Sequence, residues 1–182
     1  MHEKRFNREI ERLRDPERLA RLEVNRCIDL ALAELKNIHT VLDIGAGSGV
    51  FAEAFAARGL LVSGVDANAD MLPVAAGYVP TGSFKEGTAE NLPFEDKSFD
   101  LLFMGLVLHE TDNTPAAFSQ AYRVCKKRLA ILEWPFEAQP FGPPMEHRIK
   151  PETVSDLAQK AGFNNISPIR LQNLIFYCCD IS

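Results

Sequence analysis

The sequence predicts an α/β domain in which a Rossmann-like, mostly parallel seven-stranded sheet carries helices on both faces. Three observations indicate this fold class. Short apolar strands alternate with segments of helical periodicity, the first strand runs into a glycine-rich turn, and two closely spaced strands end the chain. A chain of 182 residues with 46% hydrophobic content is long enough for one such domain and too short for two. We therefore expect a single domain over residues 1–182.

The first 37 residues are expected to form a helical cap near the ligand site. Pro16 suits the first turn of a helix, and Leu19, Leu22 and Ile28 belong to an apolar stripe at helical spacing. On this helix the charged residues, Arg18 and Arg21 among them, are expected to lie outside.

Strands and helices then alternate along the chain. We expect strands at 40–45, 60–66, 83–86, 99–104 and 129–133, and helices at 48–58, 69–76 and 115–125. A helix over 151–161, capped by Gly162, precedes strands at 166–171 and 174–179, and the two residues between these strands indicate an antiparallel hairpin. In such a sheet, ligands bind at the carboxyl ends of the parallel strands.

The turn after the first strand, Val41-Leu-Asp-Ile-Gly-Ala-Gly-Ser-Gly49, has the composition of a nucleotide-binding turn. Glycines let the backbone approach a ligand closely, and the helix that follows directs free N–H groups to the same point. The next strand ends in Asp66, near the spacing at which a carboxylate binds the hydroxyls of a ribose. Together these features indicate an adenosine-containing ligand.

The spacing of the glycines separates two kinds of adenosine ligand. A dinucleotide fingerprint, G-x-G-x-x-G/A, would need a small residue at Val50, whereas the chain has D-x-G-x-G-x-G, with Asp43 before the first glycine. A carboxylate repels a pyrophosphate and attracts an ammonium group, so Asp43 favours a cationic ligand. Alternatively, Asp43 ends the strand by bonding nearby backbone N–H groups.

Four segments, 41–49, 65–66, 87–94 and 98–102, resemble in order the motifs of class I S-adenosylmethionine-dependent methyltransferases. The resemblance is strongest to the small-molecule group that includes the ubiquinone and menaquinone biosynthesis methylases, and it spans about residues 38–180. It implies S-adenosylmethionine as the cofactor. It also implies the strand order 3-2-1-4-5-7-6, with the last strand antiparallel.

The resemblance further implies roles for individual residues. The backbone of Gly45, Ala46 and Gly47 would hold the methionine part of the cofactor, Asp43 would face its ammonium group, and Asp66 would bind both ribose hydroxyls.

The adenine would lie between two further groups of residues. Ala67 and Met71 would flank one side of the ring, and Ala89 with Glu90 would close the other. Thr88 stands where the family usually has an acid, so either its hydroxyl or a backbone carbonyl would meet the adenine amine. Met104, at the end of the fourth strand, completes the expected cofactor-binding set.

His109 is the candidate catalytic residue. Methyl transfer is an in-line displacement in which alignment supplies most of the gain, so a base is needed only when the acceptor must lose a proton. His109 follows the fourth strand, where the family often carries a histidine, and it could act as that base and contact the substrate. Alternatively, it only shapes the pocket. Trp134, with its neighbour Glu133, and His147 are weaker candidates for substrate contact.

Residues 135–151 form a candidate substrate loop. The segment holds five prolines together with Phe136 and Phe141 and has no periodicity. Such a stiff connection after the fifth strand is typical of a lid, although a plain surface crossover has the same composition.

Composition excludes several other functions. A net charge of −5 argues against nucleic acid as a partner, and no Asn/Asp-Pro-Pro-aromatic element follows the fourth strand. The four cysteines lack metal-ligand spacing, and the sequence has neither a signal-peptide core nor an apolar run of membrane-spanning length, so we expect no metal, no membrane span and a cytoplasmic setting. The oligomeric state stays open.

The favoured function is methyl transfer from S-adenosylmethionine to a small-molecule substrate. One alternative is a non-catalytic protein that binds or senses S-adenosylmethionine, because Asp43 and Asp66 serve binding and no base is obligatory. A more remote alternative is an NAD(P)-dependent oxidoreductase, which Val50 and Asp43 disfavour.

Overall fold

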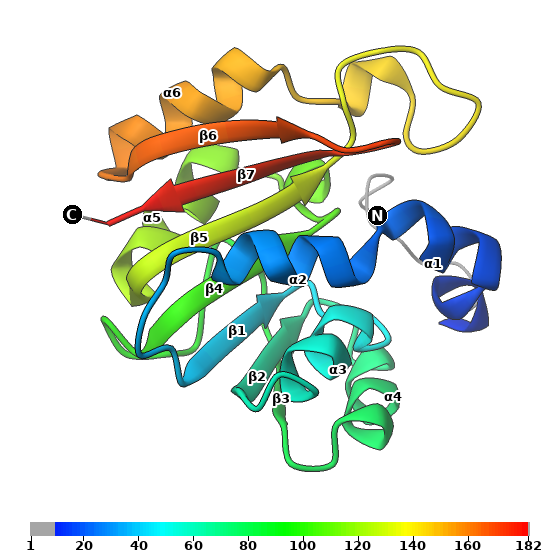
Figure 1. The fold of residues 1–182 in the computed structure, drawn as a ribbon, viewed down its shortest axis with the longest axis vertical. Helices are drawn as coiled ribbons and strands as arrows, with labels where there is room; N and C mark the ends of the chain where they lie inside the picture. The colour runs from blue at the N-terminus through cyan, green and yellow to red at the C-terminus, as the bar shows by residue number, and fades with distance from the viewer. Residues whose placement is uncertain (1–9, 182) are drawn as a thin grey trace.

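A seven-stranded sheet forms the centre of the computed structural model, which describes residues 10–181 (Figure 1). The strand order is β3-β2-β1-β4-β5-β7-β6; β1 to β5 pair in parallel, and β7 is antiparallel to both of its neighbours. The predicted order and the antiparallel last strand are therefore confirmed. The strands are β1 (Thr40–Ile44), β2 (Leu61–Asp66), β3 (Ser83–Glu86), β4 (Phe99–Gly105), β5 (Cys125–Glu133), β6 (Asn164–Arg170) and β7 (Ile175–Asp180).

Helices cover both faces of the sheet, as predicted (Figure 1). On one face, α2 and α3 pack over a core that includes Val41 and Phe103, with α4 beside α3; on the other face, α5 and α6 cover Leu42 and Ile44. Among residues 10–181, none of the helices has the length and apolar character that a membrane crossing requires. The helices are α1 (Pro16–Leu22), α2 (Val24–Leu32), α3 (Val50–Ala56), α4 (Met71–Tyr78), α5 (Thr114–Val124) and α6 (Pro151–Ala161), with 3₁₀ turns η1 (Ile10–Arg14), η2 (Leu108–Glu110) and η3 (Met145–His147).

The expected helix over residues 1–37 is divided, and its first nine residues lie outside the described range. The α1 helix starts at Pro16 behind Asp15, whose side chain accepts from the backbone N–H groups of Glu17 and Arg18. Glu23 adopts the left-handed conformation (φ 47°) and separates α1 from α2. Because of this turn, α2 lies along the sheet while α1 turns toward its edge (Figure 1).

The β5 strand starts at Cys125, four residues before the expected start at Leu129. The run Lys126-Lys127-Arg128 hid the strand, because its charges mask the apolar pattern. Arg128 is nonetheless buried. Its guanidinium bonds both oxygens of Asp180 on β7 (Nε–Oδ1 2.6 Å, Nη2–Oδ2 3.2 Å) and donates to the carbonyl oxygen of Ala33 (2.8 Å), which fixes the end of α2 to the sheet.

The other differences are shifts of element ends. The helix expected from residue 48 begins at Val50, because the glycine turn continues through Gly49, and the helix expected over 69–76 occupies Met71–Tyr78. The closing hairpin is confirmed, with Leu171 N–H donating to the carbonyl oxygen of Leu174 (3.0 Å).

Candidate cofactor and acceptor site

The glycine turn between β1 and α3 exposes backbone atoms that no side chain covers, at the carboxyl ends of the parallel strands. Gly45, Gly47 and Gly49 all have positive φ (71°, 53° and 77°), which only glycine adopts without strain. A Cβ at Gly45 would lie 2.5 Å from Cγ2 of Val107, so glycine is also required there for space. The N–H groups of Gly45 and Ala46 donate to the carbonyl oxygen of Val65 (2.8 and 3.0 Å), which holds the turn against β2.

Asp66 is held in a fixed orientation beside this turn. Gly47 N–H donates to its Oδ2 (2.7 Å) and Asn68 N–H donates to its Oδ1 (2.8 Å). A carboxylate has about four lone-pair directions, so each oxygen can accept more than one hydrogen bond. Asp66 can therefore accept hydrogen bonds from two neighbouring hydroxyls of a ligand.

A cavity of about 1080 Å³ opens at this edge, between the glycine turn, α1 and the segment after β5. Figure 1 shows α1 and the segment after β5 at the same end of the sheet. Most of the residues that the sequence predicted for the site line this cavity. For the cofactor they are Gly45, Ala46, Gly47, Asp66, Ala67, Met71, Thr88, Ala89 and Glu90, and for catalysis or substrate they are His109, Trp134 and His147.

Asp43 and Met104, both expected in the cofactor-binding set, do not line the cavity. The Asp43 side chain is 1% exposed and lies under the turn on the α3 side of the sheet, where its Oδ2 accepts from Ala52 N–H (3.1 Å). Burial raises the pKa of Asp43 to about 7, although the Ala52 hydrogen bond opposes this. Asp43 thus bonds a nearby backbone N–H group, as the alternative to a cofactor contact described above expects. Met104 is fully buried in the core between β4 and the helices behind it.

Glu90 has a structural partner in addition to its place in the cavity wall. Its Oε1 accepts from the N–H of Asp112 (2.8 Å), which joins the segment after β3 to the segment before α5. Thr88 forms an isolated antiparallel bridge with Asn91 in the same turn. The turn expected to adjoin the adenine is therefore short and is held both by its own bridge and by a bond to the segment before α5.

The N-terminal segment was expected as a cap near the ligand site, but its arginine side chains were expected to point away from that site. Arg18 and Arg21, expected on the outer face, line the cavity because the turn at Glu23 redirects α1. Arg14 fastens the segment to the glycine turn, since its Nε and Nη2 donate to the carbonyl oxygen of Ser48 (3.2 and 2.8 Å) and its Nη1 pairs with Glu53 (2.8 Å). The left-handed residue that separates α1 from α2 is a glutamate, so composition gave no signal for the turn.

His109 and Glu133 form a buried pair at the ends of β4 and β5. His109 Nδ1 lies 2.9 and 3.0 Å from the two Glu133 oxygens, and the backbone N–H groups of His109 and Trp134 donate to the same carboxylate (3.1 and 2.7 Å). Because a carboxylate only accepts, Nδ1 carries the proton and Nε2 is the nitrogen available to the cavity. Burial alone would lower the pKa of His109, but the charge and hydrogen bond of Glu133 outweigh it and raise this pKa above its ordinary value.

The candidate substrate loop is wound around one buried guanidinium. Arg148 is 6% exposed, and it donates to the carbonyl oxygens of Pro135 (3.2 Å), Glu137 (2.6 Å), Phe141 (2.8 Å) and Pro143 (2.9 Å). These bonds hold an irregular segment in one shape. They present its aromatic and proline residues to the cavity.

The site fits the cofactor that the sequence implies. The backbone of the turn lines the cavity, Asp66 offers two oriented acceptor oxygens, and Ser48 Oγ is buried without a hydrogen-bond partner in the described part of the chain. A ligand with vicinal hydroxyls and an amino acid group would satisfy these features. Fold and site together define a class I, Rossmann-like domain that binds S-adenosylmethionine.

Comparison with known proteins identifies the family. Residues 42–131 match the family model described as a methyltransferase domain. The chain is 39% identical over 100 residues to the uncharacterized methyltransferase YcgJ of Bacillus subtilis (52% of this chain, 40% of that protein). It is 34% identical over 103 residues to the demethylmenaquinone methyltransferase of Renibacterium salmoninarum (57% and 44%). Residues 42–131 therefore form a methyltransferase domain, and the whole chain spans less than half the length of these curated relatives.

A solved structure shows the same fold over nearly the whole chain. The SAM-dependent methyltransferase from Aquifex aeolicus superimposes with a TM-score of 0.83 at 23% sequence identity, and the match covers 95% of this chain and 97% of that one. The likeness therefore includes the N-terminal segment and the closing hairpin, which lie outside the family match.

Proposed function

We propose that the chain transfers a methyl group from S-adenosylmethionine to a small-molecule acceptor and that His109 accepts the acceptor's proton. The observation that carries this proposal is the His109–Glu133 pair, which opens onto the cavity that also contains the glycine turn and Asp66. The Renibacterium relative, by its name, has a small-molecule acceptor, demethylmenaquinone, which supports the acceptor class.

The chain's own residues would bind and orient the two reactants. The backbone of Gly45, Ala46 and Gly47 would hold the methionine part of the cofactor, and Asp66 would accept from the ribose hydroxyls. When bound, S-adenosylmethionine supplies a methyl group on a sulfonium sulfur, which keeps the electron pair of the broken C–S bond as the methyl passes to the acceptor. Alignment is then the main task of the protein.

His109 would remove a proton from an acceptor hydroxyl. In the neutral ring, Nε2 carries the lone pair that receives this proton, while Nδ1–H stays bonded to Glu133. Glu133 has a positioning role, because it fixes the tautomer and stabilises the imidazolium that forms. Backbone N–H groups of His109 and Trp134 hold Glu133 in turn.

The acceptor would lie between α1 and the loop over residues 135–151, within one domain that extends over residues 1–182. Trp134, Phe141 and His147 line this part of the cavity. Arg148 would act on the acceptor indirectly, through the shape of the loop.

Two variants and a pH profile test the proposal. Tritium transfer from labelled S-adenosylmethionine would be measured against a panel of hydroxylated aromatic acids, thiols and amines. For a hydroxyl acceptor, His109→Gln should lower the maximal rate about 100-fold or more while S-adenosylhomocysteine affinity changes less than about threefold. Glu133→Gln should move the acidic limb of the rate profile to lower pH, because the charge that raises the pKa of His109 is lost.

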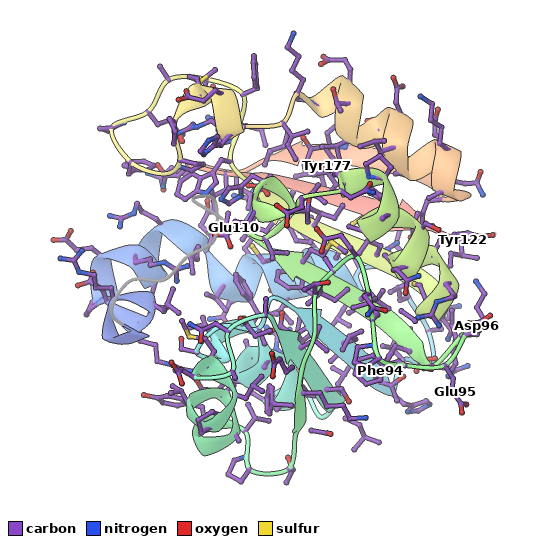
Figure 2. The ribbon with its side chains drawn as sticks, turned by 180° about the vertical axis from the view of Figure 1, so that it is seen from behind. Phe94, Glu95, Asp96, Glu110, Tyr122 and Tyr177 are labelled. Carbon is purple, nitrogen blue, oxygen red and sulfur yellow. The ribbon has the colours of Figure 1, made fainter. Side chains whose placement is uncertain are left out.

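Glu95→Gln is the matched control, since Glu95 is exposed on the opposite side of the molecule from Glu110 and the cavity (Figure 2). It should leave both rate and profile unchanged. A His109→Gln variant that keeps more than about a third of the activity would show that alignment alone drives transfer. Retained S-adenosylhomocysteine binding without transfer to any acceptor would favour the non-catalytic alternative.

A further inference from the structure

Charged side chains are unevenly distributed over the cavity wall. The carboxylates of Asp66 and Glu90 line the half beside the glycine turn, whereas the half formed by the N-terminal segment and the loop carries the guanidinium groups of Arg12, Arg18 and Arg21 together with the carboxylate of Asp15. The proposed cofactor uses the acidic half. The basic half therefore faces the space left for the acceptor.

Arg18 is held in place by the backbone of the preceding turn. It is half-buried, and its Nη1 donates to the carbonyl oxygen of Leu13 (2.8 Å). Burial and the neighbouring charge of Arg21 lower the pKa of Arg18, and Glu110 acts in the opposite direction. Within residues 10–181, no carboxylate lies at ion-pair distance from Arg18 or Arg21.

Glu110 and Asp15 are the carboxylates on this side of the cavity. Glu110 lies at the edge that faces α1 (Figure 2), and its Oε1 is 3.9 Å from Nε2 of His109. The Oδ1 of Asp15 accepts from the backbone N–H groups of Glu17 and Arg18. Two carboxylates thus share this side with three guanidinium groups and a histidine. The positive charge at this end of the cavity is only partly compensated.

Aromatic rings adjoin the guanidinium groups. The guanidinium of Arg21 lies 5.3 Å from the centroid of the Phe141 ring, and Phe141 lies 5.9 Å from Trp134 at an interplanar angle of 51°. The two mutually tilted rings form an apolar wall next to the charge. A planar ring that carries an acidic group would complement both parts of this wall.

We propose that the acceptor is a small planar anion whose ring packs on Trp134 and Phe141 and whose carboxylate or phosphate pairs with Arg18 and Arg21. Guanidinium groups bind either anion in a bidentate manner, and a partly buried site strengthens the pairing. This inference rests on the proposed function for the reacting end of the molecule, which would lie at His109. The anionic end can be tested without turnover.

Trp134 is the only tryptophan of the chain, so its fluorescence reports ligand binding at this wall directly. The full-length protein, saturated with S-adenosylhomocysteine, would be titrated with benzoate, benzamide, benzylammonium and phenyl phosphate. Benzoate and phenyl phosphate should bind at least about tenfold more tightly than benzamide, because benzamide has the same ring without the charge. A stronger response to phenyl phosphate than to benzoate would identify phosphate as the preferred anion.

Arg18→Gln, Arg21→Gln and the double variant should lose the preference for benzoate and keep their affinity for benzamide. Arg58→Gln is the matched control, because Arg58 pairs with Asp29 on the surface and does not line the cavity. It should retain the preference. Circular dichroism and S-adenosylhomocysteine binding would confirm that each variant is folded.

Three outcomes would overturn the inference: equal affinity for benzoate and benzamide, tighter binding of benzylammonium, or no saturable response to either anion up to about 10 mM. A preference that survives in the double variant would overturn it too. If the unmodified protein prefers benzoate to benzamide but transfers no methyl group, the proposed function is contradicted and this inference is not. Intact methyl transfer without an anion preference would contradict only this inference.

Discussion

Replacement of Asp43 by asparagine should stabilise the protein in alkaline solution and much less in acid. Burial raises the pKa of Asp43 from 3.8 to about 7, and the carboxyl lies under the glycine turn with Ala52 N–H as its partner. Between these two values the folded chain holds a proton that the unfolded chain has released. The free energy of unfolding therefore falls as pH rises through this interval.

The size of the effect follows from the two pKa values. Their interval, at about 1.4 kcal/mol per pH unit, corresponds to about 4 kcal/mol above pH 7, of which roughly a third is already present at pH 5. An asparagine side chain in this place does not titrate and can still accept from Ala52 N–H. The stabilisation by Asp43→Asn should thus be larger at pH 8 than at pH 5 by about 3 kcal/mol.

Urea unfolding of both proteins at pH 5 and pH 8, followed by Trp134 fluorescence and circular dichroism, measures this difference. The comparison between the two proteins cancels the other titrating groups. An equal effect of Asp43→Asn at both pH values would refute the reasoning, because it would mean that Asp43 is already ionised in the folded protein at pH 5. Calorimetry with S-adenosylmethionine would show in addition whether the charge of Asp43 contributes to cofactor binding from beneath the turn.

Two further predictions follow from particular contacts. Asp66→Ala should weaken S-adenosylhomocysteine binding at least about tenfold, since charge-assisted hydrogen bonds contribute about 1.5–3 kcal/mol each, and unchanged calorimetric affinity would remove Asp66 from the site. Arg128→Ala should lower the free energy of unfolding by about 3 kcal/mol, because Asp180 and the carbonyl groups at the end of α2 lose their partner. The exposed pair tested by Arg58→Ala should contribute less than about 1 kcal/mol, and similar losses in both variants would contradict the role of burial.

The sheet could be predicted from the sequence because its strands are short apolar runs separated by turn residues. The element ends were less predictable where charge or conformation overrode the pattern. Lys126 and Lys127 concealed the start of β5, and Glu23 adopts a left-handed turn that its residue type does not indicate. In both places, contacts with distant parts of the chain decide the local structure.

The cofactor half of the site was more predictable than the acceptor half for a physical reason. Gly45, Gly47 and Asp66 belong to one unit of strand, turn, helix and strand, so their spacing in sequence fixes their arrangement in space. Arg18, Arg21 and His109 line the same cavity only because of tertiary packing, and their spacing in the sequence does not predict this. The sequence pattern did not show which face of the sheet Asp43 occupies. Successive residues of β1 face opposite sides of the sheet, and the carboxyl of Asp43 points toward α3 instead of the cavity.

Apart from η3, the segment from Pro135 to Arg148 has no regular secondary structure, and it is organised around a single cation. Four of its backbone carbonyl groups surround the guanidinium of Arg148, much as the donor atoms of a chelator surround a metal ion. Apart from the one to Gln139 Oε1 (3.0 Å), the bonds use main-chain oxygens, so most of the side chains between Phe136 and Met145 are not needed to keep the shape. Acceptor preference could therefore be changed by substitution in this segment while Arg148 keeps the backbone of the segment in place. Loss of the Arg148 side chain would free all parts of the segment at once.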